Sequence, residues 1–457
     1  MKKLTVASVA IAAFAFVFLP DCFGEPARAE TSEQLHARLA KLCPPRPETA
    51  ARFRGEAAYP AAAKPYRDCA KAAFEYMTAL PAMTTLVETG EPDNHYQHNA
   101  YPSKTHAWHI RAMLAYAKLD PSARAKALRF AAASAEYLAT QLEPADAPLA
   151  YWPPTYGRKP LKFDPRTDGP EKGNEMVGNE PAGAVRYRGE VMLVYPAEVG
   201  IAFAQLARET GERRWLDLAA RIAGTYLRLR RADGSWPLKL KLATGETVCG
   251  NPLVSLRPLE LFEALHAATG ERRWKDAADA AFVWLEAHPL RDWNWDGQFE
   301  DIRPAKPYTN PTKHNAIDSM MYILRRFPGD RARLRQARDL LRFCEDRFVC
   351  WEKPANHPGW EAPSVLEQYS CFCPIDASAA KMIRGYLAMY RAEGRAEDLA
   401  KARTLANTVT RLQKPSGRIP TFWTGDWAAD VRYDWLNCMA SGALALLELA
   451  DCNLDGR

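Results

Sequence analysis

Residues 210–215 read TGERRW, and residues 269–274 repeat the same six letters 59 positions later. Weaker copies of this turn surround Gly329 and Gly394, at further intervals of 59 and 65 residues. Tandem supersecondary units show such a period, with a turn residue at a fixed place in each unit. The chain is therefore predicted to be an array of helical hairpins joined by glycine turns.

Helical patterns follow both clear turns in the same phase. Apolar residues recur at i, i+3, i+4, i+7, i+8 and i+11, counted from Trp215 in one copy and from Trp274 in the other. This spacing places one buried stripe along a helix. A second helical pattern precedes each turn, as in residues 258–268. Each unit is thus helix, glycine turn, helix.

Extending the pattern in both directions predicts an all-α ring. The first helices of the hairpins are expected at residues 101–118, 195–209, 251–268, 310–327, 373–392 and 434–450. The second helices are expected at residues 122–142, 214–230, 272–287, 331–347 and 396–412. The last hairpin lacks a second helix, and an early helix at residues 61–79 supplies it if the chain ends meet. We predict an (α/α)6 toroid; the alternative is an open superhelix, which needs polar caps at both ends.

The first 29 residues have the pattern of a secretory leader. Lys2 and Lys3 precede an apolar run over residues 4–19, and residues 27–29 form a small-x-small cleavage site. The run is too short for a typical membrane span. We predict a signal peptide at residues 1–29 and a single catalytic domain at residues 30–457. The mature protein is expected to be secreted or periplasmic, without a membrane partner.

Charge and cysteine usage limit the partners. The formal net charge of +6 is small and evenly mixed, which gives no reason to expect nucleic acid but suits an anionic sugar. Nine of the ten cysteines lie beyond the leader, and no CxxC pair occurs among them. We therefore predict no metal and no other cofactor. Disulfide pairing and oligomeric state are left open.

Long connections separate the predicted hairpins. They run over residues 80–100, 143–194, 231–250, 288–309, 348–372 and 413–433, each longer than a helix-to-helix connection requires. In a toroid of hairpins these segments gather at one face, opposite the glycine turns. Long loops on a rigid scaffold commonly hold binding residues. The functional site is expected at this face.

Tryptophan is concentrated in these connections, which hold eight of the thirteen: Trp152, Trp236, Trp293, Trp295, Trp351, Trp360, Trp423 and Trp427. Flat aromatic faces beside polar groups suit a sugar ring, whose C–H face stacks while its hydroxyls find polar partners. We predict a saccharide cleft, with substrate contacts from Trp236, Trp293, Trp295, Trp360, Trp423 and Trp427. The alternative for each is packing that fixes a loop to the barrel.

The hairpin period, the DGSWP loop at residues 233–237 and the aromatic, acidic segment around Glu300 resemble one known group. Over residues 60–450 the chain is similar to the six-hairpin glycosidase-like enzymes. These (α/α)6 toroids include glycoside hydrolases, polysaccharide lyases and epimerases. The resemblance implies the fold and a carbohydrate substrate, and it does not select a reaction.

Residues 293–310, WNWDGQFEDIRPAKPYTN, form the richest of these segments. Glycoside hydrolysis usually needs one protonated and one ionised carboxyl group. Glu300 or Asp301 is predicted to supply one of them. Because adjacent side chains point in different directions, the other is expected from a different loop. The candidates are Glu361, Glu367 and Asp426, with a capping role as the alternative for each.

Four histidines, His95, His98, His106 and His109, lie within fifteen residues. An HxxH pair on a helix permits metal binding, but no third-ligand motif accompanies it. His98 and His106 are therefore predicted to bind sugar hydroxyl groups.

A lyase or C5-epimerase acting on uronic-acid glycans is the second hypothesis. Such an enzyme neutralises a carboxylate and removes the adjacent proton with a base. The base is expected to be a tyrosine or a histidine, and both roles could come from the string Arg303, Lys306, Tyr308, Asn310 and His314 or from Arg418 with Tyr433. A third hypothesis is a non-catalytic glycan-binding protein, which would need the tryptophans but not Glu300 or Asp301.

Overall fold

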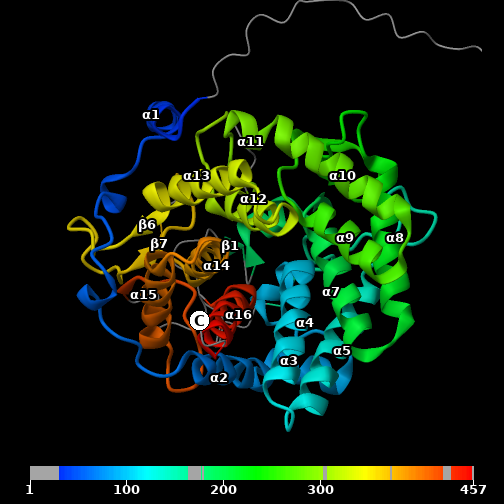
Figure 1. Cartoon of the computed structure of the whole chain (residues 1–457). Helices are drawn as coiled ribbons and strands as arrows, with labels where there is room; N and C mark the ends of the chain where they lie inside the picture. Colours follow the sequence, from blue (N-terminus) through cyan, green and yellow to red (C-terminus); the bar gives the residue numbers. More distant parts are fainter. Residues whose placement is uncertain are drawn as a thin grey trace, which may run out of the picture.

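The structure, a computed structural model, describes residues 30–162, 176–177, 180–301, 306–370, 373–425 and 434–454. Its helices form two concentric rings, as Figure 1 shows, and this confirms the predicted all-α toroid. The inner ring contains α4 (Pro102–Leu119), α7 (Tyr195–Thr210), α9 (Arg257–Thr269), α12 (Lys313–Arg326), α14 (Asp376–Glu393) and α16 (Leu436–Leu454). The outer ring contains α2 (Tyr66–Ala79), α5 (Arg124–Thr140), α8 (Arg213–Leu229), α10 (Arg272–Ala287), α13 (Arg331–Phe348) and α15 (Ala396–Leu412).

The ring closes where the two ends of the chain meet. Helix α2 packs against α16, the last helix, and both lie beside α4. At the solvent side of this contact the guanidinium group of Arg67 lies 2.9 Å from the Asp451 carboxylate. The open superhelix is therefore excluded.

The repeated glycines end inner helices in the left-handed conformation. Gly211, Gly270 and Gly394 have φ values of 77°, 71° and 71°, and each N–H bonds to a carbonyl of the preceding turn. Glycine adopts this conformation without the strain that a Cβ atom causes. Trp215 and Trp274, which follow the two TGERRW turns, are fully buried.

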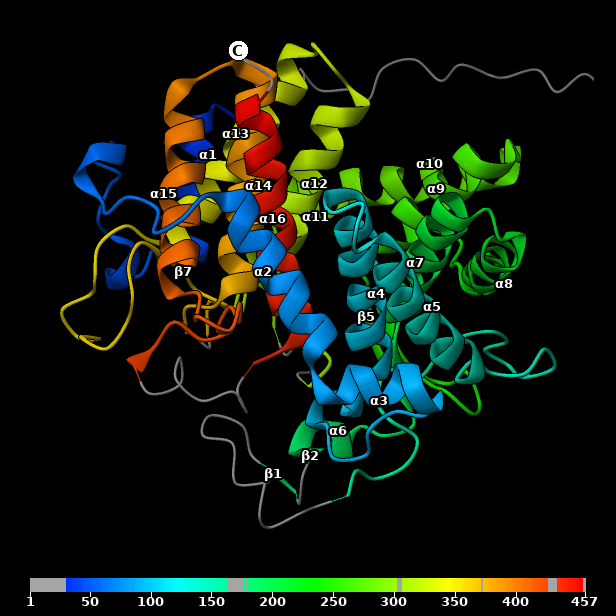
Figure 2. The same cartoon turned by 90° about the horizontal axis from the view of Figure 1, so that it is seen from below.

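The long connections contain short elements that the periodicity does not predict. An antiparallel sheet joins β3 (Glu190–Met192), β4 (Pro237–Lys241) and β5 (Thr247–Pro252). Two-residue strands pair as β1 (Met176–Val177) with β2 (Glu180–Pro181) and β6 (Val349–Cys350) with β7 (Ser364–Val365). The remaining helices are α1 (Ser32–Leu42), α3 (Pro81–Thr89), α6 (Ala182–Arg186) and α11 (Pro289–Asp292). In Figure 2, α3, α6 and β2 lie at one end of the ring.

Within the described residues no helix is long and apolar enough to cross a membrane. The predicted signal peptide lies outside the described residues.

Candidate active site

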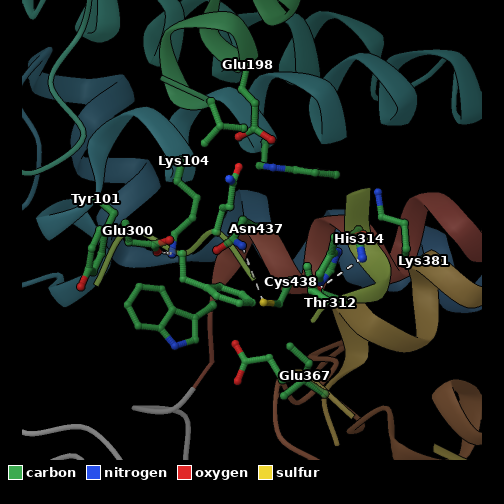
Figure 3. Close-up of a pocket in the computed structure, with 18 of the residues that line it drawn as sticks. Tyr101, Lys104, Glu198, Glu300, Thr312, His314, Glu367, Lys381, Asn437 and Cys438 are labelled. Carbon is green, nitrogen blue, oxygen red and sulfur yellow. Dashed lines mark hydrogen bonds and ion pairs between the residues drawn. The ribbon is translucent and has the colours of Figure 1, made fainter. Parts of the chain in front are cut away.

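A cavity of about 410 Å³ opens inside the toroid, toward the end where the long connections gather. The beginnings of all six inner helices contribute to its wall, because each inner helix starts at the same end of the ring. Residues of the connections before α7, α9, α12, α14 and α16 complete the wall. Figure 3 shows side chains from these elements converging on one space. A site built this way depends on closure of the ring.

Glu300 is held by two inner helices. Lys104 of α4 forms an ion pair with its Oε1 atom, and the Tyr195 hydroxyl of α7 donates to Oε2 over 2.5 Å. The residue is only 8% exposed. Burial disfavours its charged form, but the charge of Lys104 and the donated hydrogen bonds outweigh burial and hold the pKa of Glu300 below its ordinary value. Glu300 is therefore a carboxylate at neutral pH.

Asp301 points in a different direction. The Tyr101 hydroxyl donates to its Oδ2 atom over 2.6 Å, and the buried Oδ1 atom has no hydrogen-bond partner among the described residues. Its carboxyl group packs on Gly183, where a Cβ atom would lie 2.4 Å from Asp301 Cγ. Burial and the charge of Glu300 raise the pKa of Asp301 to about 6. The two adjacent carboxyl groups thus point in different directions, and their pKa values are shifted in opposite senses.

Glu367 reaches the same cavity from the connection after β7. Its backbone N–H donates to the carbonyl of Cys373 over 2.8 Å. Burial raises the pKa of Glu367 and the charge of Glu300 adds to the shift, while Lys313 opposes it. Figure 3 shows Glu367 across the cavity from Glu198. The structure therefore brings together Glu300 and Glu367, two predicted residues with opposite pKa shifts.

A network of four charged residues, Glu198, Arg257, Asp318 and Lys381, lies along the inner helices beside these carboxyl groups. Arg257 lies 3.3 Å from Glu198 and 3.6 Å from Asp318, and Lys381 lies 2.5 Å from Asp318. Burial disfavours ionisation of Asp318, but Lys381 and Arg257 outweigh it and lower its pKa. Each of these cations is therefore matched by a carboxylate.

His314 of α12 also lines the cavity. Burial lowers the pKa of its imidazole, and the charges of Lys313 and Lys381 lower it further. The ring is therefore neutral at neutral pH. A neutral imidazole can donate and accept hydrogen bonds at the same time.

Comparison with known proteins gives fold-level matches only. No family model matches the sequence, and no curated protein is similar to it. Among solved structures, cellobiose 2-epimerase from Spirochaeta thermophila DSM 6192 is similar with a TM-score of 0.54 and 15% identity, over 80% of this chain and 89% of that chain. A family 76 glycoside hydrolase from a bovine Bacteroides thetaiotaomicron strain has a TM-score of 0.52 and 14% identity, over 86% and 78%. Unsaturated glucuronyl hydrolase from Streptococcus agalactiae has a TM-score of 0.51 and 11% identity, over 84% and 92%.

The chain has the six-hairpin glycosidase-like fold. At these identities the likeness shows the fold and leaves the reaction to be argued from the residues of the cavity.

The structure does not place the five described tryptophans of the predicted saccharide cleft at the cavity wall. Each of these five side chains is at most 8% exposed and belongs to the hydrophobic core. The five are Trp236, Trp293, Trp295, Trp360 and Trp423. The Trp236 indole donates to the Tyr226 carbonyl over 2.8 Å. These five tryptophans therefore pack the connections against the barrel. Trp427 lies outside the described residues.

Other predicted contacts also lie away from the cavity. His106 and His109 are buried where α4 meets α5, both against the Ser134 hydroxyl. The Tyr308 hydroxyl donates to the Asp292 carbonyl over 2.7 Å, and Arg418 pairs with Asp434. These residues have structural partners in place of sugar hydroxyls. Asp426, Arg303 and Tyr433 lie outside the described residues, and Lys306 and Asn310 are absent from the cavity wall.

Trp435, which was not among the predicted contacts, does lie at the cavity. It lines the cavity, with its ring centroid 4.6 Å from Lys104 Nζ. His98 stacks on it at 4.4 Å and is itself 2% exposed, so His98 supports the wall from behind.

Six residues of the cavity wall were not predicted from the sequence: Lys104, Tyr195, Glu198, Arg257, Lys381 and Trp435. The only sequence signal for the charged ones is a charged side chain in the first two turns of a helix whose remaining faces are apolar, and composition alone does not distinguish it from a solvated charge. Glu198, for example, lies in α7, where nearly every neighbour is buried. In a ring of helices such a position faces the axis.

The described residues hold no group of three or more His, Cys, Asp or Glu side chains placed to bind a metal ion.

Proposed function

We infer that this protein is a carbohydrate-active enzyme, and specifically a glycoside hydrolase that uses Glu300 and Glu367. The observation that supports this most is the pair of carboxyl groups in one cavity with opposite electrostatic environments. Glu300 is paired with Lys104 and ionised, whereas burial favours the protonated form of Glu367. Glycoside hydrolysis assigns different roles to two such groups.

In this mechanism Glu367 donates its proton to the glycosidic oxygen as the bond to the anomeric carbon breaks. Glu300 acts on the anomeric carbon, by direct attack or by taking a proton from the attacking water. Lys104 and Tyr195 stabilise the negative charge of Glu300 before reaction and orient both of its oxygens. Asp301 is the less suitable partner, because its carboxyl group is turned toward Tyr101 and Gly183.

A neutral sugar suits this cavity better than the anionic sugar suggested by the net charge. The cations of the described wall, Lys104, Arg257 and Lys381, already pair with carboxylates. A substrate carboxylate would have to compete with those partners and would lie close to Glu300 and Asp318. Sugar hydroxyl groups, in contrast, can bind both members of an ion pair.

The same observation weighs against the lyase or epimerase hypothesis. That chemistry requires cationic groups available for the substrate carboxylate. Of the described residues assigned to it, Tyr308 and Arg418 lie away from the cavity, and only His314 lines the wall. Export remains part of the proposal, on the strength of the leader-like residues 1–29.

The test incubates the purified protein with neutral and uronic-acid glycans and follows new reducing ends together with absorbance of an unsaturated uronate. Hydrolysis predicts new reducing ends on neutral glycans without that absorbance. Both signals together on uronic-acid glycans would establish elimination and overturn the hydrolase assignment. Binding without any product would support the glycan-binding hypothesis.

A further inference from the structure

Two fully buried lysines hold the backbone beside the two candidate catalytic residues. Lys239 of β4 donates to the backbone carbonyl of Glu300. Lys313, the first residue of α12, donates to the carbonyl of Leu366 over 2.6 Å and to the carbonyl of Glu367. Neither lysine was singled out from the sequence.

Burial of an ammonium group away from water is costly unless polar partners replace the solvent. At Lys313 the cost is visible, because burial lowers its pKa to about 7. A lysine can donate three hydrogen bonds from the end of a long stem, so it can reach from a rigid element to a neighbouring connection and bind two carbonyls together. A buried lysine is therefore expected to have a function at the carbonyl groups to which it donates.

We propose that Lys239 and Lys313 are positioning residues, each fixing the backbone from which one reacting carboxyl group extends into the cavity. This inference rests on the proposed function for its kinetic consequence. The fixing of the two connections by the lysines does not depend on the proposed function.

The two attachments resemble each other in arrangement. At Glu300 the carbonyl also accepts from the Tyr156 hydroxyl, so this peptide is held from β4 and from the segment after α5. At Glu367 a single lysine bridges two successive carbonyls, while the Glu367 N–H bonds to Cys373. Both carboxyl groups thus extend from peptides that are fixed independently of their side chains. Displacement of a catalytic group by about 1 Å can cost about 100-fold in rate, so such fixing has a large kinetic effect.

The experiment compares Lys239→Met and Lys313→Met with Arg347→Met as the matched control. Arg347 is equally buried and donates to the carbonyls of Cys43 and Phe343, but it does not line the cavity. Two readouts are taken on each folded variant: kcat and KM on the best substrate, and deuterium exchange of peptides over residues 296–301 and 364–370. Lys239→Gln and Lys313→Gln, which keep a donor, serve as rescue variants and replace the methionine variants if those do not fold.

The expected result is faster exchange in residues 296–301 for Lys239→Met and in residues 364–370 for Lys313→Met. In both, kcat falls by about 10- to 100-fold while KM changes by less than about threefold, and glutamine restores part of kcat. Arg347→Met loses stability and keeps its kcat. Unchanged exchange in both lysine variants, or faster exchange with unchanged kcat, would overturn the proposal. If the wild type cleaves no glycan, the proposed function fails, and the exchange data alone decide whether the lysines fix these connections.

Discussion

The Tyr195 hydroxyl lies 2.5 Å from Glu300 Oε2 and donates to it, whereas Oε1 of the same carboxylate pairs with Lys104. Tyr195 begins α7, and Lys104 lies in the first turn of α4. Two neighbouring inner helices therefore hold one carboxylate from a connection that lies 105 residues beyond Tyr195 and 196 residues beyond Lys104. The candidate site exists only when the ring is assembled.

Replacing Tyr195 by phenylalanine tests this contact. Loss of a hydrogen bond to a charged group is worth about 1.5–3 kcal/mol, so kcat/KM is expected to fall by about 10- to 100-fold. The pKa of Glu300 should rise, which moves the acid limb of the pH profile to higher pH. Tyr66→Phe is the control, since it removes a hydroxyl that donates to Asn407 over 2.6 Å outside the cavity. An unmoved acid limb in Tyr195→Phe would contradict the role given to this hydroxyl.

Amide replacement tests the two reacting groups. Glu300→Gln and Glu367→Gln should each lower kcat/KM by at least about 100-fold, because each removes one half of general acid–base catalysis. Asp301→Asn should cost less, since Asp301 faces Tyr101 and Gly183. Steady-state kinetics on variants with unchanged thermal unfolding provide the measurement. Full activity in both glutamine variants would remove this pair from consideration.

The pH dependence should be bell-shaped, with its optimum between the lowered pKa of Glu300 and the raised pKa of Glu367. Glu300 must be ionised, and its pKa is lowered, so activity is lost only as the pH falls through that lowered value. Glu367 must be protonated, and its pKa is raised, so activity is lost as the pH rises through that raised value. The alkaline limb should therefore be absent from the residual activity of Glu367→Gln. An alkaline limb that persists unchanged in Glu367→Gln would exclude Glu367 as the acid.

Two tryptophans should respond to replacement in opposite ways. Trp236→Ala is expected to destabilise the fold by about 3–5 kcal/mol, as for other large core side chains, with KM unchanged in the folded protein. Trp435→Ala should raise KM by about 2- to 10-fold, the range expected for loss of an aromatic contact. Chemical denaturation and substrate titration separate the two effects. A raised KM in Trp236→Ala at normal stability would restore the sugar-stacking prediction for this residue.

The fold could be predicted because the hairpin repeat is a local signal. Gly211 and Gly270 end inner helices in the left-handed conformation that glycine favours, and the phase of the apolar stripe identifies each helix on its own. Ring closure followed from an unpaired helix at each end, and the contact between α2 and α16 confirms it. The three-stranded sheet was missed because its strands are short and drawn from two different connections, so no periodicity reveals them.

The site could be predicted only in part, for a physical reason. Glu300 and Glu367 could be proposed from the sequence because both lie in long connections, where binding residues commonly occur. Both line the cavity. The direction of a tryptophan in such a connection depends on the packing beneath it, and Trp236 and Trp295 turned toward the core. Lys104 and Glu198 lie inside regular helices, and in the sequence they look like ordinary charged residues on a solvent-exposed helix face. Their role appears only once six helices share an axis.

The masses of the products test the central claim most directly. The wild-type protein, Glu300→Gln and Glu367→Gln are incubated with the same neutral oligosaccharides, and all products are weighed by mass spectrometry. We predict that the wild-type products together weigh the substrate plus one water, and that each variant forms these products at least about 100-fold more slowly. Products that together weigh the same as the substrate would indicate elimination, and a product of unchanged mass with altered configuration would indicate epimerisation. Either result would contradict the hydrolase assignment.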